Sequence, residues 1–141
     1  FKDRSPFTLS GGEKRKVALA SVIVCDPEVL ILDEPSAGLD GASKKAFWDW
    51  LRSYSNSQRT VIFITHSLEE AVAAERVLVL SNGALLFADV PREVFSHVNT
   101  LRRVGLEPPI SAELSYELRK RVSFPMALTV DELIRALDGD F

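Results

Sequence analysis

One apolar run, Val29–Leu32, constrains the fold of this chain more than any other feature, and it ends at two successive carboxylates. A continuous apolar run of this kind is typical of a strand buried on both faces, as in a parallel sheet. Thr60–Thr65, rich in β-branched residues, predicts a second strand. Predicted helices at Ser10–Val24 and Gly41–Tyr54 alternate with these strands, and the alternation predicts an α/β fold with mainly parallel strands.

The rest of the chain changes character along its length. Ser67–Glu75 predicts a short helix whose first and fourth residues have capping-box spacing. Asn82-Gly83 separates two apolar runs and predicts an antiparallel hairpin. From about Ser96 no further strand pattern occurs. Two helical segments follow, near Ser111–Val122 and near Val130–Leu137, and Thr129 with Glu132 is predicted to cap the second. The tail is therefore predicted to be a small helical extension.

Composition fixes the broad class of protein. The 141 residues carry 17 basic and 20 acidic side chains, for a net charge of −3, and 46% are hydrophobic. This balance suits one globular domain with a core and argues against a surface that coats nucleic acid. The single Cys25 excludes an internal disulfide and favours a reducing compartment. No apolar run approaches the roughly 20 residues that a membrane-spanning helix needs.

Ser10-Gly11-Gly12-Glu13 begins the first predicted helix and is a candidate anion site. Free N–H groups and the helix dipole attract anions at such an end, and two glycines let a phosphate come close. The alternative is a plain capped helix, since Ser10 and Glu13 have the spacing of a capping box. The sequence contains no GxxxxGK[ST] loop, because none of its seven glycines precedes Lys-Ser or Lys-Thr.

Asp33 and Glu34 follow the first predicted strand, and His66 follows the second. Ligands gather at the carboxyl ends of parallel strands. Asp33 is a candidate Mg²⁺ ligand, and Glu34 a candidate base for an attacking water. A solvated strand end and a structural histidine are the corresponding alternatives. The loop from Ser36 to Asp40 is, taken alone, a turn that ends in a helix cap.

Together these segments resemble the ATP-binding-cassette (ABC) ATPases. Leu9–Glu13 resembles the family's signature motif, Val29–Pro35 its Walker B segment, Ser36–Asp40 its D-loop and Ile64–His66 its switch-histidine loop. The tail is similar to the C-terminal extension of the energy-coupling-factor (ECF) ATPases. That similarity rests on the segments Gly105–Pro109, Leu118–Arg121 and Thr129–Leu133.

The resemblance implies a role for each matching residue. In this family two ATPase domains sandwich two ATP molecules. Ser10 and Gly12 would bind the γ-phosphate held by the opposite subunit, Gly11 would permit the close approach, and Glu13 would stand where Gln is commoner, near the ribose. Asp33 would organise Mg²⁺, Glu34 would be the general base, His66 would contact the γ-phosphate, and Asp40 would couple the two sites.

The resemblance also implies an organisation. Residues 1–95 would form the C-terminal half of a P-loop ATPase domain, lacking Walker A, and residues 96–141 a helical extension that serves as a possible dimerisation element. We expect a part of a longer subunit, and no ATP turnover by this piece alone. ATP and Mg²⁺ are the implied cofactors.

The function implied is ATP hydrolysis that powers an ECF-type importer of a vitamin or metal ion. The partners would be a second ABC ATPase subunit and an integral membrane subunit, with no nucleic acid, at the cytoplasmic face of the membrane. Two alternatives remain: a chromosome-maintenance or DNA-repair ATPase of the same superfamily, and a non-catalytic dimerisation or regulatory module. The transporter form of Ala37–Asp40 and of Thr65–Glu70 favours the importer.

Overall fold

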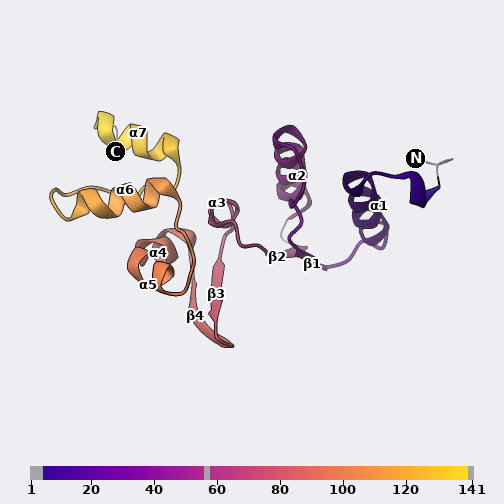
Figure 1. The fold of residues 1–141 in the computed structure, drawn as a ribbon, viewed down its shortest axis with the longest axis horizontal. Helices are drawn as coiled ribbons and strands as arrows, with labels where there is room; N and C mark the ends of the chain where they lie inside the picture. Colours follow the sequence, from indigo (N-terminus) through magenta and orange to yellow (C-terminus); the bar gives the residue numbers. More distant parts are fainter. Residues whose placement is uncertain (1–4, 56–57, 140–141) are drawn as a thin grey trace. The chain divides into compact units, whose positions relative to one another are not determined.

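The computed structural model describes residues 5–55 and 58–139 (Figure 1). The outer ends of both predicted domains, residues 1–4 and 140–141, lie outside the described residues, as do residues 56 and 57. The chain divides into two compact units, Phe1–Ile64 and Thr65–Phe141, and each is described by itself.

The first unit combines helices with one parallel strand pair. Its elements are the 3-10 helix η1 (Pro6–Thr8), helix α1 (Gly11–Ile23), strand β1 (Val29–Asp33), helix α2 (Gly41–Tyr54) and strand β2 (Thr60–Ile64). β1 and β2 pair in parallel, with Val29 opposite Thr60 and Asp33 opposite Ile64. Both strands and both long helices therefore lie where the sequence predicts them, within one residue at their ends.

One face of the β1–β2 pair carries the core of this unit. Leu30 is buried together with Leu51 and Tyr54 of α2. Trp48 packs edge-on against Phe63 of β2, with ring centroids 4.9 Å apart. Because side chains alternate along a strand, this packing uses every second residue of each strand. α2 thus covers one face of the strand pair.

The opposite face of the strand pair is open, so the prediction that the first strand is buried on both faces is wrong for this chain. Val29 is 53% exposed and Ile31 63%, and Ile62 and Ile64 of β2 are also about half exposed. The apolar run shows that the strand is suited to burial on both faces. Whether each face is buried depends on whether another layer of the fold packs against it. The described residues of this chain pack such a layer on one side only.

Helix α1 forms as predicted but does not bury an apolar stripe. Its apolar positions Val17 and Val22 are 41% and 48% exposed, and Val24 just beyond it is 84% exposed. Local capping therefore fixes where this helix begins, as described below, while few of its side chains contribute to a core.

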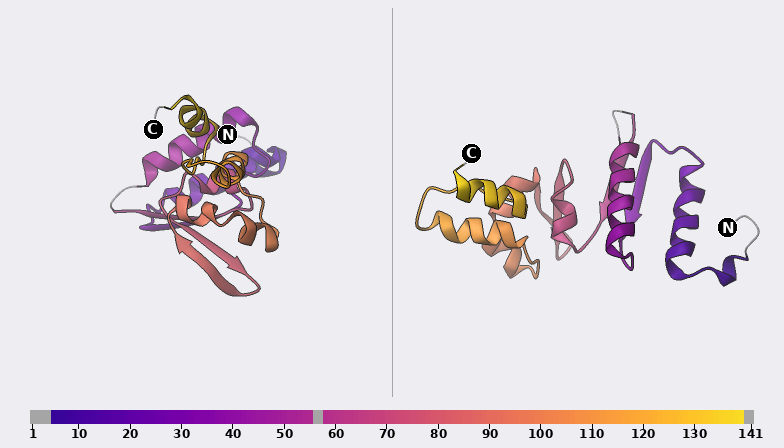
Figure 2. Two further views of the ribbon diagram at one scale, coloured as in Figure 1. Left: turned by 90° about the vertical axis from the view of Figure 1, so that its left-hand side faces the viewer. Right: turned by 90° about the horizontal axis from the view of Figure 1, so that it is seen from above.

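The second unit begins with a short helix and a hairpin. Its elements are α3 (Leu68–Ala71), β3 (Val77–Ser81), β4 (Ala84–Asp89), α4 (Pro91–Ser96), α5 (Val98–Arg103), α6 (Ile110–Arg119) and α7 (Val130–Asp138). β3 and β4 pair antiparallel, as predicted, with an irregularity between Val79 and Leu80. The turn residues Asn82 and Gly83 both have positive φ, 49° and 77°, which suits a tight hairpin turn. Figure 2 shows the hairpin beside the helices that follow it.

Helix α3 is shorter than the predicted segment Ser67–Glu75, and the predicted cap is wrong. The Ser67 side chain makes no capping hydrogen bond. The Ser67 N–H instead donates to Thr65 Oγ1, 3.0 Å away. A hydroxyl two residues earlier thus takes the place of the expected capping box.

A single hydrophobic core unites the short helix, the hairpin and the C-terminal helices. Its fully buried members include Phe95, Leu101 and Ala112, each with no exposed surface. The remaining members are Leu68, Ala71, Val77, Val79, Val94, Met126 and Leu128. The sequence analysis missed α4 and α5. These helices of six residues each are stabilised mainly by this packing, because isolated short helices are marginal.

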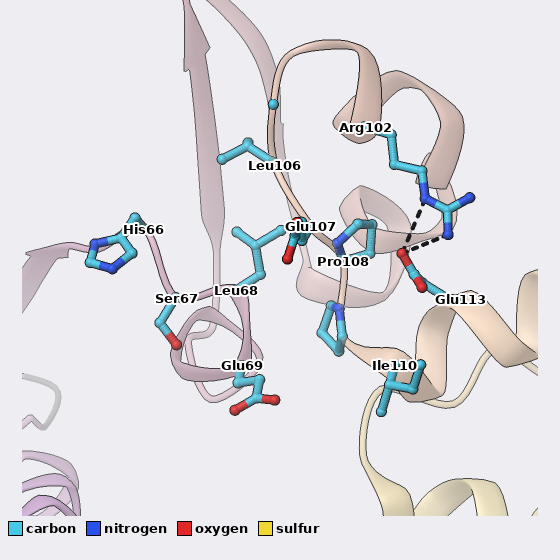
Figure 3. Close-up of a pocket in the computed structure, with 12 residues that line it drawn as sticks. His66, Ser67, Leu68, Glu69, Arg102, Leu106, Glu107, Pro108, Ile110 and Glu113 are labelled. Carbon is cyan, nitrogen blue, oxygen red and sulfur yellow. Dashed lines mark hydrogen bonds and ion pairs between the residues drawn. The ribbon is translucent and has the colours of Figure 1, made fainter.

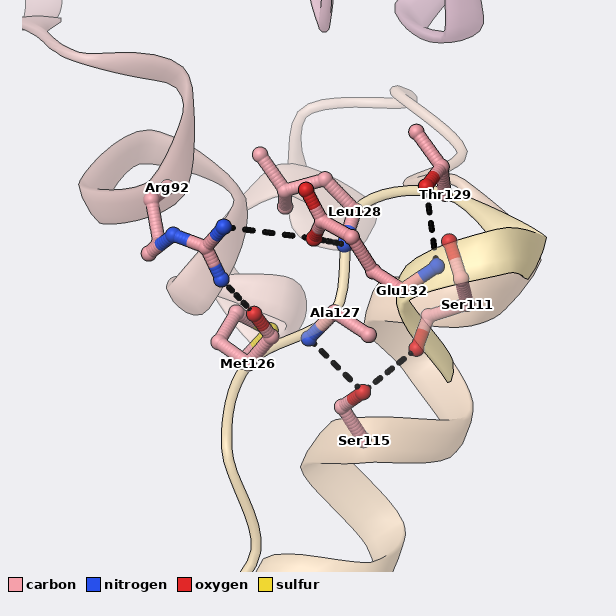
Figure 4. Close-up of polar contacts among 8 residues, drawn as sticks. All are labelled: Arg92, Ser111, Ser115, Met126, Ala127, Leu128, Thr129 and Glu132. Atoms are coloured by element: carbon pink, nitrogen blue, oxygen red, sulfur yellow. Dashed lines mark hydrogen bonds and ion pairs between the residues drawn. The ribbon is translucent and has the colours of Figure 1, made fainter. Parts of the chain in front are cut away.

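Polar contacts fasten α7 and the segment before it to α6 and α4 (Figure 4). The buried Ser115 hydroxyl donates to Ser111 O at 2.8 Å and accepts from Ala127 N at 3.0 Å. The Glu132 carboxylate accepts from Leu128 N and Arg92 Nη2 at 2.8 and 3.2 Å, and Arg92 Nη1 donates to Met126 O. Thr129 caps α7 as predicted, by accepting from Glu132 N.

Candidate functional site

The signature-like segment forms the N-terminus of α1. Ser10 has extended backbone angles, and its Oγ accepts from Glu13 N at 3.3 Å, while Glu13 Oε2 accepts from Ser10 N at 2.8 Å. This reciprocal pair is the predicted capping box. A Cβ atom added to Gly11 or Gly12 would meet nothing within 4 Å. The glycines are thus not required by packing within this chain, and they leave the helix tip open to an approaching anion.

The C-terminal end of β1 presents the two candidate acidic residues. Asp33 is exposed and pairs in register with Ile64, and Glu34 is half-buried. Glu34 N donates to Ile64 O at 2.9 Å, so the strand pairing continues through Glu34. The Glu34 backbone has a φ of 44°, in the left-handed region. A non-glycine residue there costs about 1 kcal/mol, and such strain is concentrated at functional sites.

The turn after Glu34 is held by short-range hydrogen bonds. Ala37 N donates to Glu34 O and Leu39 N donates to Ser36 O, each at 3.2 Å, and Ser36 is buried. Asp40 ends the turn as the N-cap of α2, accepting from Ser43 N at 2.8 Å and from Ser43 Oγ at 3.1 Å. These hydrogen bonds from Ser43 lower the pKa of Asp40, because they stabilise the ionised carboxylate. The predicted cap is confirmed.

Asp33 suits Mg²⁺ that arrives with a nucleotide. Mg²⁺ keeps several waters and is usually held by one or two carboxylates together with phosphate oxygens. An exposed carboxylate at a strand end offers one such ligand. Among residues 5–55 and 58–139 no group of three or more His, Cys, Asp and Glu side chains could hold a metal ion by itself.

His66 belongs to the second unit and follows β2 by two residues. It is exposed, and it lies on the rim of an open hollow of about 900 Å³. Figure 3 shows His66 to Glu69 on one side of the hollow and Leu106 to Ile110 on the other. Arg102 pairs with Glu113 at 2.8 Å at its edge.

Most of the candidate residues thus lie in the first unit, at two separate places. Ser10, Gly11, Gly12 and Glu13 share one helix tip, and the acidic residues share one strand end; His66 stands in the other unit. Sequence reasoning missed Thr65 and Glu70, whose side chains form a hydrogen bond to each other next to His66. A hydroxyl residue directly before the histidine, with a glutamate four residues after it, was the available signal.

In the described part of the chain, no helix combines the length and hydropathy that crossing a membrane requires.

Comparison with known proteins agrees with this arrangement. A family model described as ABC transporter matches residues 1–37, which include the helix tip and both strand-end carboxylates. A solved bacterial Atm1-family ABC exporter with ATP bound is 30% identical and superposes with a TM-score of 0.56, covering 83% of this chain and 18% of that one. By both comparisons the chain is similar to ABC transporters.

Over most of its length the chain is similar to ECF transporter ATP-binding proteins. It is 39% identical over 95% of its length to EcfA1 of Caldanaerobacter subterraneus subsp. tengcongensis. It is 40% identical over 99% of its length to EcfA2 of Symbiobacterium thermophilum, and 43% identical over 86% to EcfA2 of Clostridioides difficile. The chain covers 50%, 49% and 43% of these proteins, so it spans about half the length of the curated relatives it matches.

Proposed function

We propose that this chain is part of the ATP-binding and ATP-hydrolysing subunit of an ECF-type ABC importer. The observation that carries the proposal is the end of β1. There, two successive carboxylates stand at the carboxyl edge of a parallel strand pair, and the second occupies a left-handed backbone conformation. The similarity to ECF ATP-binding proteins over almost the whole chain supports the same conclusion.

Asp33, Glu34 and His66 then each have one role in ATP hydrolysis. Asp33 holds Mg²⁺, which neutralises phosphate charge when it is bound. Glu34 accepts a proton from the attacking water, and His66 contacts the γ-phosphate. Phosphoryl transfer depends mainly on such positioning and charge stabilisation.

The helix tip serves a second copy of the site. Ser10 donates its hydroxyl and Gly12 its backbone N–H to the γ-phosphate of a nucleotide bound by a partner ATPase subunit. Gly11 permits the close approach, and Glu13 lies near the ribose. The open space around both glycines supports this role. Asp40, at the end of the turn that follows Glu34, couples the two sites across the dimer.

The chain then represents one portion of a larger ATPase domain. The chain spans about half the length of its ECF relatives. The phosphate-binding GxxxxGK[ST] loop that the family resemblance implies would lie in another part of the subunit. The β1–β2 pair belongs to a larger, mainly parallel sheet. We assign residues 1–95 to the ATPase domain and residues 96–141 to a C-terminal helical extension that takes part in dimerisation.

The complete assembly includes a second ATPase subunit and an integral membrane subunit, at the cytoplasmic face of the membrane. ATP drives closure because it binds the closed dimer better than the open one. The cargo is a small micronutrient, a vitamin or a metal ion, recognised by the membrane partner.

Glu34→Gln in the assembled transporter ATPase tests the proposal. A general base contributes about 10²–10⁴-fold to rate, so turnover should fall by at least about 100-fold. The variant should still form an ATP-dependent dimer. Glu28→Gln, at an exposed acid just before β1, is the matched control and should hydrolyse ATP normally.

Three results would contradict this reading. Normal turnover by Glu34→Gln would remove Glu34 as the base. Stimulation of ATP hydrolysis by DNA would favour the maintenance or repair class. Robust hydrolysis by the 141-residue chain alone would refute the requirement for a phosphate-binding loop from elsewhere.

A further inference from the structure

The hydroxyl group of Thr65 forms two hydrogen bonds that fix the backbone around His66. Thr65 Oγ1 donates to Glu70 Oε2 at 3.0 Å and accepts from Ser67 N at 3.0 Å. The hydroxyl therefore uses its one proton and one of its lone pairs within five residues of chain. His66 lies between the two residues, Thr65 and Ser67, that this hydroxyl joins.

The acceptor of this hydrogen bond is itself fixed in place. Glu70 is a glutamate only 8% exposed, on the four-residue helix α3. A helix this short does not hold its position alone. Its neighbours Leu68 and Ala71, each 8% exposed, insert into the core built with Phe95, Leu101 and Ala112.

The hydrogen bonds and the core contacts form one continuous connection. It runs from the C-terminal helices, through Leu68 and Ala71, to the Glu70 carboxylate, and from there through Thr65 to the backbone of the histidine loop. A nearly buried carboxylate that accepts from a hydroxyl favours a single loop conformation, because breaking the pair removes a hydrogen bond that water cannot readily replace.

We infer that Thr65 and Glu70 are positioning residues that hold the His66 imidazole in its productive place, and that the core of the C-terminal helices anchors them. This inference rests on the proposed role of His66 in ATP hydrolysis. Misplacement of a contacting group by about 1 Å can reduce a rate by about 100-fold, so the bracket formed by Thr65 and Glu70 acts on kcat.

Thr65→Val tests the bracket, because valine keeps the shape of threonine and lacks the hydroxyl. In the assembled ATPase we expect kcat to fall at least about tenfold with KM for ATP unchanged, and Thr65→Ser to restore it. Glu70→Gln keeps an acceptor oxygen and should lose less than Glu70→Ala. Thermal unfolding identifies any variant that loses activity by failing to fold.

A double-mutant cycle separates positioning from a merely structural role. If Thr65 acts through His66, adding Thr65→Val to a His66→Ala protein should cause no further loss of kcat. An additive loss, or wild-type kcat in Thr65→Val, would overturn the inference.

A readout independent of activity keeps this test distinct from that of the proposed function. The chain contains two histidines, His66 and His97, whose NMR ring signals are assigned with His66→Gln and His97→Gln. Thr65→Val should shift the His66 signals and leave those of His97 unchanged, and Thr65→Ser should resemble the wild type. Unchanged His66 signals would refute the bracket. If the assembled ATPase hydrolyses no ATP but shows this shift, the ATPase role is refuted and the bracket is retained.

Discussion

The two faces of β1 provide a direct test of the fold, because adjacent residues of similar size point in opposite directions. Leu30 is 2% exposed and packs on α2, whereas Ile31 is 63% exposed on the open face. Fully burying such a side chain contributes about 1.5–3 kcal/mol. Leu30 gains nearly all of this, and Ile31 about one third.

Leu30→Ala should therefore lower the free energy of unfolding by about 2–5 kcal/mol, since a cavity adds to the lost burial. Ile31→Ala should cost about 1 kcal/mol, including its lower β propensity. Urea unfolding followed by tryptophan fluorescence measures both, because the chain's two tryptophans, Trp48 and Trp50, belong to the same cluster as Leu30. Equal losses in the two variants would refute the assignment of one covered and one open face.

Two further predictions concern residues of the candidate site. The hydrogen bonds from Ser43 lower the pKa of folded Asp40 below its ordinary value of 3.8. The stabilisation by ionised Asp40 is therefore present above that value and is lost as the pH falls through the lower pKa of the folded state. Asp40→Asn retains a capping oxygen but cannot titrate. Between about pH 5 and pH 2 its free energy of unfolding, measured with urea, should therefore fall less than that of the wild type. An equal fall in the two proteins would be evidence against the cap. Gly12→Ala should leave the melting temperature unchanged or raised, because alanine favours helix by up to about 1 kcal/mol and its Cβ meets open space, while ATP hydrolysis by the assembled protein falls. A clear drop in melting temperature would show that Gly12 serves the fold.

The features predicted correctly depend on residues close together in sequence. Ser10, Asp40 and Thr129 cap their helices because each accepts a hydrogen bond from the N–H three residues later. Asn82-Gly83 forms its turn because both residues adopt positive φ. Such contacts require no knowledge of the rest of the fold.

The features that were missed depend on contacts between distant residues. α4 and α5 are ordered by a core that includes Ala112 and Leu128, far along the chain. The open face of β1 could not be predicted either, since apolar content does not show which side receives a covering layer. The expected capping box at Ser67 did not form. The Ser67 N–H, from which the Glu70 carboxylate would have accepted a hydrogen bond, donates to Thr65 Oγ1, and Thr65 Oγ1 in turn donates to Glu70.

The shared core of the second unit has a consequence for deletion experiments. Cutting the chain after Ser96 would remove Leu101, Ala112 and Met126 from the core. Val94 and Phe95 would then be exposed hydrophobic residues at the new chain end. Loss of subunit pairing in such a shortened protein would then reflect collapse of the remaining fold and not removal of a contact. Exchanging a solvent-facing residue of α7, such as Leu137, interrogates the same tail while leaving its scaffold intact.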